Sequence, residues 1–227
     1  MTAQEMHDAF KFGLDKFDSL NYPNFEPAEI DLLLNQGQDT FVKQRYGFTN
    51  TKRTSFEETQ KRTEDLKNVV LRYNTLTFVS PTNINPDAVF ATLPTDHWLI
   101  VQELAEITYT DCHGDIITEQ VFVKPIQHND YSKLINNPFE KPDQRTILRL
   151  MDQGLVELLS SPGVLVNTYY LTYIKEPARI DLATAVTSEL SPMVHQEIVN
   201  TSIQIALEGI EARRNQTFTP IVGDKEE

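Results

Sequence analysis

The side chains with the most obvious chemical potential are Cys112 and His113, which are neighbours in the stretch DCHGD. A catalytic Cys–His pair needs its thiolate and imidazole within hydrogen-bonding distance, but neighbours on a turn usually direct their side chains apart. His97, His128 and His195 are scattered along the chain, so the four clustered ligands of a structural zinc site are not supplied. We therefore expect a solvated turn, and keep a hydrolase that uses Cys112 with a histidine as an alternative.

Carboxylates offer little more. Asp111 and Asp115 flank the same turn and could hold a cation, but acidic residues are common in turns for conformational reasons. The sequence has no GxSxG, GxxxxGK[ST], GxGxxG or HExxH motif, and its eight glycines make a phosphate-binding loop unexpected. We predict that the protein is not an enzyme and has no catalytic residues, no metal site and no cofactor.

The charge of the chain is strongly negative and unevenly distributed. The formal net charge is −13 over 227 residues. Residues 1–42 carry eight acidic and two basic side chains, residues 43–72 carry four and eight, and residues 73–227 carry 21 and ten. Phosphate contacts require basic residues, so broad nucleic-acid binding is excluded. A surface that repels DNA without holding it is compatible with this charge.

The basic segment 43–72 is the exception, and three roles stay open for it. It could contact phosphate, an acidic partner, or the chain's own acidic helices. The regular interleaving of aromatic and basic residues that is typical of a single-strand binder is missing from it. The candidate contact residues are Lys52, Arg53, Lys61 and Arg62.

Two features bear on the environment of the protein. Cys112 is the only cysteine, so a disulfide within the chain is impossible, which fits a reducing compartment such as a cytoplasm. No apolar run approaches the roughly 20 residues of a membrane helix, and the first residues do not resemble a signal peptide.

The fold expected from the patterns is α+β, with N-terminal helices, a central antiparallel β-sheet containing a long hairpin, and a C-terminal helix. Capping boxes at Thr2–Glu5 and Ser55–Glu58 predict helices, the second one polar and reaching about Arg72. Glu26-Pro27 and Ser191-Pro192 each place proline at the first turn of a helix, and the last helix should reach about Arg214. We expect one domain over residues 1–215, with a helical region (residues 1–72), a β-rich region (residues 73–190) and a closing helix (residues 191–215), followed by a flexible acidic tail (residues 216–227).

The β-rich region centres on a hairpin that turns at Asp111–Asp115, where Gly114 is available for a left-handed conformation. Its first strand contains Gln102–Ile107, which is also compatible with a helix on propensity alone. The strands predicted are Leu76–Val79, Trp98–Thr110, Ile116–Lys124, Arg145–Met151, Leu155–Leu159 and Tyr169–Lys175.

The stretch NDYSKLINNPFEKPDQRTILRL combines a short helix with a rigid loop. Asp130 is placed to begin the helix, and Pro138 ends it, because a residue before proline avoids the helical region. Phe139 then lies on a tight loop between two prolines, with little conformational entropy to lose on docking. It either contacts another subunit or fills the core of its own domain. The candidate interface residues are Asn136, Asn137, Pro138, Phe139, Pro142, Arg145 and Arg149.

The segment His128–Leu150 also resembles a recurring segment in structural proteins of crAss-like tailed phages, with its short helix, Asn-Pro-Phe, Lys-Pro and Arg-containing strand. Glu26–Gln38 is similar to the second helix of that family, and Leu93–Trp98 to the start of its long hairpin. Tyr173–Pro177 and Leu190–Glu208 resemble its strand-then-proline step and its closing helix. Glu140 departs from the pattern, in which a basic residue is expected.

The resemblance implies a ring or adaptor protein of the head–tail connector, or neck, between portal and tail. Such a protein would form a homo-oligomeric ring of about twelve subunits to match a portal. It would extend the portal channel for DNA retention and ejection, and dock the next ring, without catalysis or specific DNA binding. It would be assembled in the bacterial cytoplasm and end in the virion. The alternative is an acidic protein-binding module that forms no ring.

Overall fold

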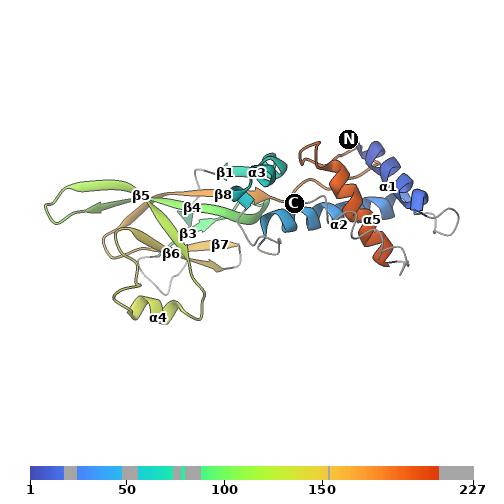
Figure 1. Ribbon diagram of the computed structural model, residues 1–227. Helices are drawn as coiled ribbons and strands as arrows, with labels where there is room; N and C mark the ends of the chain where they lie inside the picture. The colour runs from blue at the N-terminus through green and yellow to red at the C-terminus, as the bar shows by residue number, and fades with distance from the viewer. Residues whose placement is uncertain (18–24, 48–55, 74–77, 80–87, 153, 210–227) are drawn as a thin grey trace. The chain divides into compact units, whose positions relative to one another are not determined.

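The computed structural model describes the chain except residues 18–24, 48–55, 74–77, 80–87, 153 and 210–227. The chain divides into two compact units (Figure 1), the first made of Met1–Val69 and Pro177–Glu227 and the second of Val70–Glu176. Helices dominate the first unit and one β-sheet the second, so the α+β class is confirmed. None of the helices in the described ranges has the length and apolar content to cross a membrane.

The first two helices of the first unit begin where local capping signals predict. In the capping box before α1 (Ala3–Phe17), the Glu5 carboxylate accepts the Thr2 N–H at 2.8 Å, and the Thr2 hydroxyl accepts the Glu5 N–H at 3.2 Å. α2 (Pro27–Tyr46) begins with proline at its first turn, where a backbone N–H would have no acceptor within the helix. The short elements η1 (Phe56–Glu58) and α3 (Gln60–Leu66) and the long α5 (His195–Gly209) complete the unit.

α5 packs against α1 and α2 through small residues that allow a close approach. A Cβ on Gly37 of α2 would lie 2.1 Å from Ser202 Oγ and 2.9 Å from the Ile198 carbonyl oxygen. A Cβ on Gly13 of α1 would lie 2.4 Å from Ile203 Cδ1. At Gly37 a larger residue would therefore displace the backbone of α5, whereas at Gly13 the end of the Ile203 side chain would have to move. The apolar faces are buried at Met6, Phe10, Leu14, Ile30, Leu34, Phe41, Ile198 and Leu207.

An irregular segment, residues 177–190, also belongs to the first unit, although we expected it in the β-rich region. Asn35 of α2 both donates to the Ile180 carbonyl at 2.9 Å and accepts the Ile180 N–H at 2.8 Å. Gln38 donates to the Ala178 carbonyl at 3.1 Å. Side chains of α2 thus satisfy backbone groups of this segment, whose own backbone pairing includes an isolated β-bridge between Asp181 and Val186.

The second unit is built on an eight-stranded sheet among the described residues, in the order β1-β8-β4-β5-β6-β7-β3-β2. All neighbouring strands are antiparallel except β5 and β6. The strands are β1 (Val70–Tyr73), β2 (Phe78–Val79), β3 (Ala88–Thr92), β4 (His97–Thr110), β5 (Ile116–Pro125), β6 (Thr146–Asp152), β7 (Leu155–Leu159) and β8 (Leu165–Lys175). Because five residue steps, from Tyr73 to Phe78, join the two outermost strands, these lie within about 18 Å of one another. The sheet must therefore curl.

Both faces of the curled sheet are buried in part. One face gathers a core from six strands, including Ala105, Ile107, Val121, Ile147 and Tyr169. The other face buries Phe90, Leu148, Leu150 and Leu159 under the segment that contains α4 (Tyr131–Asn136), with Tyr131 and Leu134 packed against them. β6 therefore buries alternate residues on opposite faces, as a central strand must.

Most expected elements are confirmed, including both long hairpin strands, the helix Tyr131–Asn136 and the left-handed Gly114, whose φ is 91°. Gln102–Ile107 is strand, because its alternate residues Glu103, Ala105 and Ile107 are buried in the sheet core. β3 was not predicted. Of the strand expected at 76–79, Phe78 and Val79 are strand and the rest lies outside the described residues.

Two helix predictions are wrong at an end. The polar helix expected to reach about Arg72 ends at Leu66, and Val70–Tyr73 forms β1 instead. Pairing with β8 outweighs helix propensity there, as tertiary contacts often do. The closing helix begins at His195, because Ser191–Val194 forms a turn in which the Val194 N–H donates to the Ser191 carbonyl at 3.0 Å. Ser55 and the expected end at Arg214 lie outside the described residues.

Candidate assembly interface

The loop Asn136–Pro142 follows α4 and presents Phe139 to solvent. The Phe139 side chain is 94% exposed, the most exposed large apolar side chain among the described residues. The possibility that it fills the core of its own unit is therefore excluded. Pro142, at the far end of the loop, is buried, so the loop is anchored on its exit side.

Asn137 fixes the conformation of this loop. Its side-chain oxygen accepts the Phe139 N–H at 3.1 Å, and its side-chain amide donates to the Glu140 carboxylate at 2.8 Å. Its carbonyl accepts the N–H groups of Glu140 and Lys141 at 3.1 and 3.0 Å. Asn136 donates to the Ser132 carbonyl at 2.7 Å and so completes the end of α4. These bonds hold Phe139 outward before any partner arrives, which lowers the entropic cost of docking.

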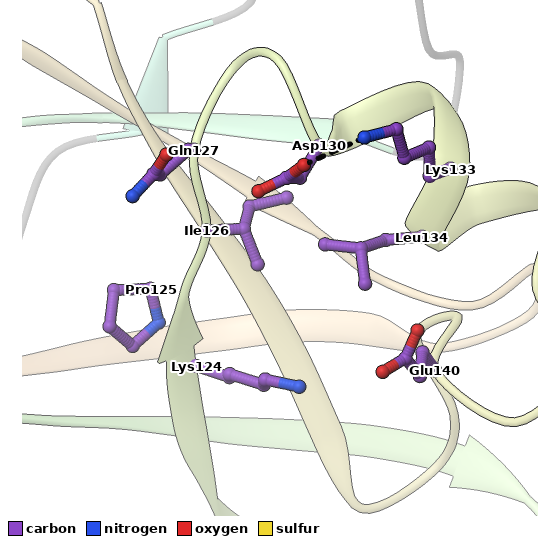
Figure 2. Close-up of a pocket in the computed structure, with 8 residues that line it drawn as sticks. All are labelled: Lys124, Pro125, Ile126, Gln127, Asp130, Lys133, Leu134 and Glu140. Carbon is purple, nitrogen blue, oxygen red and sulfur yellow. Dashed lines mark hydrogen bonds and ion pairs between the residues drawn. The ribbon is translucent and has the colours of Figure 1, made fainter.

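A cavity of about 430 Å³ lies beside the loop. Figure 2 shows Ile126 and Leu134 between the Asp130–Lys133 pair on one side and Lys124 and Glu140 on the other. The Lys133 ammonium lies 3.4 Å from the Asp130 carboxylate. Apolar side chains with a rim of both charges are typical of a site that receives a side chain or loop of another protein. Glu140, where the resemblance led us to expect a basic residue, accepts a hydrogen bond within the loop and lines this cavity.

The two arginines of the predicted interface lie in different surroundings. Arg145 is exposed. Arg149 points into the sheet, where its Nε lies 3.1 Å from the Glu103 carboxylate without an aligned hydrogen bond. The Tyr169 hydroxyl donates to the same carboxylate. Burial raises the pKa of Glu103, while Tyr169 and Arg149 oppose that rise. Arg149 therefore balances a buried charge of its own unit, a role that sequence analysis missed because Glu103 lies 46 positions away.

The basic candidates are only partly described, since Lys52 and Arg53 lie outside the described residues. Lys61 lies 3.5 Å from the Glu197 carboxylate, and Arg62 is only 7% exposed. Nearby, buried Arg45 contacts Asp65 at 3.1 Å and Glu197 at 2.5 Å. Of the three roles considered for segment 43–72, Lys61 and Arg45 thus support contact with the chain's own acidic side chains.

The Cys112–His113 pair lies at the exposed tip of the β4–β5 hairpin. Cys112 Sγ and His113 Nδ1 are 3.1 Å apart, so the expectation that their side chains diverge is wrong. Asp111 is the third member of a group whose possible ligand atoms all lie within 4.8 Å. One oxygen of Asp111 accepts the N–H groups of His113 and Asp115 at 2.8 and 3.0 Å, which is the ordinary role of Asp in a turn. Both Cys112 and His113 are exposed to solvent.

Comparison with known proteins shows the family to which the chain belongs. A family model described as phage tail ring protein 3/4 matches residues 1–217. The chain is similar to ring protein 3 of Bacteroides phage crAss001, with 28% identity over 91% of this chain and 95% of the relative. It is also similar to ring protein 4/5 of the same phage, with 22% identity over 91% and 92% of the two chains. The resemblance to ring proteins of crAss-like phages is thereby confirmed, and the chain belongs to the phage tail ring protein 3/4 family.

Proposed function

We propose that the chain forms a closed ring of about twelve copies in the neck of the virion, between portal and tail. The ring extends the portal channel, and its outer faces dock the portal on one side and the next ring on the other. It performs no catalysis. The observation that carries this proposal is the match to ring proteins over nearly the whole chain.

The loop Asn136–Pro142 supplies a contact for such a ring. Phe139 is 94% exposed and held by Asn137, and an aromatic side chain presented this way is typical of an interface hot spot. The contact would be heterologous, with Phe139 of one copy meeting a different surface of the next copy or of the adjoining ring. Repeated heterologous contacts close into a ring when the rotation allows it.

The charge of the chain supports a channel through which double-stranded DNA passes without specific binding. The net charge is −13, and Lys61 and Arg45 contact acidic side chains of the same unit. A repulsive wall avoids the phosphate contacts that would hold the genome in place. A salt titration of DNA binding would test this proposal, since any phosphate contact gives an affinity that falls steeply with salt.

The ring itself is tested by the particle mass of the purified protein over a concentration series, with negative-stain images of large species. We expect closed rings of about twelve subunits, formed by the protein alone or after addition of the portal as template. A monomer at every concentration, with and without portal, would refute the ring. A defined complex with one other protein under those conditions would indicate a binding module instead.

A further inference from the structure

The β4–β5 hairpin projects from the second unit together with the start of β8 (Figure 1), and we call these three strands the arm. Thr108 in the middle strand, β4, lies opposite Thr118 in β5 and Leu165 in β8. On the outer side, β6 first pairs with β5 at Phe122, and β1 first pairs with β8 at Leu171. Among the residues that the structure describes, two strand edges therefore have no neighbour: Ile116–Val121 (the β5 edge) and Leu165–Tyr170 (the β8 edge).

The hydrogen-bond pattern shows which backbone groups of the β5 edge face outward. The Asp111 N–H donates to the Asp115 carbonyl at 2.9 Å, and such pairs recur every second residue in an antiparallel ladder. The odd-numbered residues of β5 thus bond to β4, and the even-numbered ones face away. Ile126, an even-numbered residue just past β5, follows the same pattern and donates to the Arg149 carbonyl of β6 at 2.9 Å. Ile116, Thr118 and Gln120 accordingly offer N–H and C=O groups that no other strand of the described residues pairs with.

Neither edge carries the residues that usually protect an exposed strand. Neither contains lysine, arginine or proline, which are the common means of preventing strand addition. The one charge, Glu119, accepts a hydrogen bond from the Tyr109 hydroxyl at 3.1 Å. The β8 edge has a register shift opposite Glu106 and Ile107, at Asn167, and is regular from Thr168 to Tyr170.

Exposed apolar side chains flank the two edges. Ile116 and Phe122 of β5 are 77% and 73% exposed, and Leu165 of β8 is 68% exposed. Edges of this kind on a free monomer are sites of uncontrolled association. A defined strand partner would satisfy the outward backbone groups and cover these side chains.

We propose that the β5 edge of one copy pairs with the β8 edge of the next copy, so that the arms join into one continuous sheet around the ring. This inference rests on the proposed function, since it names the contact that builds the ring. Two different edges on opposite sides of one arm make the contact heterologous, as a ring requires. Pairing of two β5 edges would instead produce a closed dimer.

The direction of the strands fits this joint. β5 and β8 both run antiparallel to β4, so they run in the same direction. A rotation about an axis roughly along the strands preserves that direction and makes the joint parallel. The β5 strand already accepts a parallel neighbour, β6, from Phe122 onward. The incoming strand would occupy the same edge of β5 ahead of the point where β6 begins.

Gln120→Pro tests the joint, with Gln120→Ala as its matched control. Proline removes the outward N–H of residue 120, which pairs with no other strand in the described ranges. Edge strands tolerate proline at such a position. Under the conditions in which the wild-type chain forms rings, Gln120→Ala should form them equally. Gln120→Pro should keep the circular dichroism spectrum and bind its neighbours about 100-fold more weakly or worse. Equal ring formation by both variants would overturn the inference.

Hydrogen exchange of the wild-type chain provides a second measurement that needs no variant. Peptides covering Ile116–Val121 and Leu165–Tyr170 should exchange more slowly in rings than in dilute monomer. Equal exchange in monomer and rings would overturn the shared sheet, while the proposal that the chain forms rings would still stand. Protection that appears only when another ring protein is added would overturn the second copy as the partner. A wild-type chain that never forms rings would refute the proposed function, and this inference with it.

Discussion

Replacing Phe139 by aspartate should abolish ring assembly and leave the subunit folded. The side chain is 94% exposed, so its contacts contribute almost nothing to the fold, and the free energy of unfolding should change by less than about 0.5 kcal/mol. In an assembled ring the same side chain would be buried against the neighbouring subunit. At about 25 cal/mol per Å², removal of a buried aromatic anchor costs about 2–4 kcal/mol per contact.

That free energy corresponds to a roughly 30- to 1,000-fold weaker contact between neighbours. Because every contact in a closed ring is affected, the ring should disappear at concentrations where the wild-type protein is fully assembled. The assay is the particle mass over a concentration series, with circular dichroism and urea unfolding to confirm the fold. The matched control is Leu32→Asp, which changes a 60% exposed apolar side chain on α2. Wild-type ring occupancy in Phe139→Asp would refute the role of the loop.

Three further changes test other parts of the structure. Gly37→Ala should lower the free energy of unfolding by about 1–3 kcal/mol, because its Cβ would lie 2.1 Å from Ser202 Oγ. The control Gly209→Ala, whose Cβ would have nothing within 4 Å, should not destabilise the protein. Equal urea unfolding midpoints for the two variants would contradict the close helix crossing. Burial lowers the pKa of His195, so the unfolded chain binds a proton near pH 6.5 that the folded chain does not, and stability should be lost as the pH falls below about 6.5. His195→Gln should show a smaller loss between pH 7 and pH 5 in urea unfolding, and an unchanged loss would refute this source of pH dependence. Cys112→Ala should leave stability and ring formation unchanged; loss of an ester-hydrolysing activity shown by the wild-type protein would revive the hydrolase alternative.

Local signals accounted for much of the helical framework and the hairpin. The capping box Thr2–Glu5 begins α1 as predicted, and Gly114 adopts the left-handed conformation that the turn DCHGD requires. The alternation of apolar and polar residues predicted Leu148 and Leu150 on one face of β6 and Arg149 on the other. The two cores and the Arg149–Glu103 contact confirm this placement. These features depend on residues within a few positions of each other, where spacing alone constrains the structure.

Other features depend on contacts between distant segments. Val70–Tyr73 becomes a strand only because β8, about 100 residues later, pairs with it. Arg149 was placed at an interface because its partner Glu103 cannot be identified from spacing. The Cys112–His113 distance depended on side-chain rotamers at a turn, which a sequence pattern does not specify.

Local sequence was sufficient to predict the α+β class, the acidic charge and the rigid Pro-Phe loop, because propensity, charge and proline geometry are local properties. It also carried the resemblance to ring proteins, which the family match confirms. The exposure of Phe139 became known only from the folded chain, because burial depends on which elements cover a residue. The two edges of the arm, which no other described strand pairs with, also required the fold, since the neighbours of a strand are set by segments distant in the sequence.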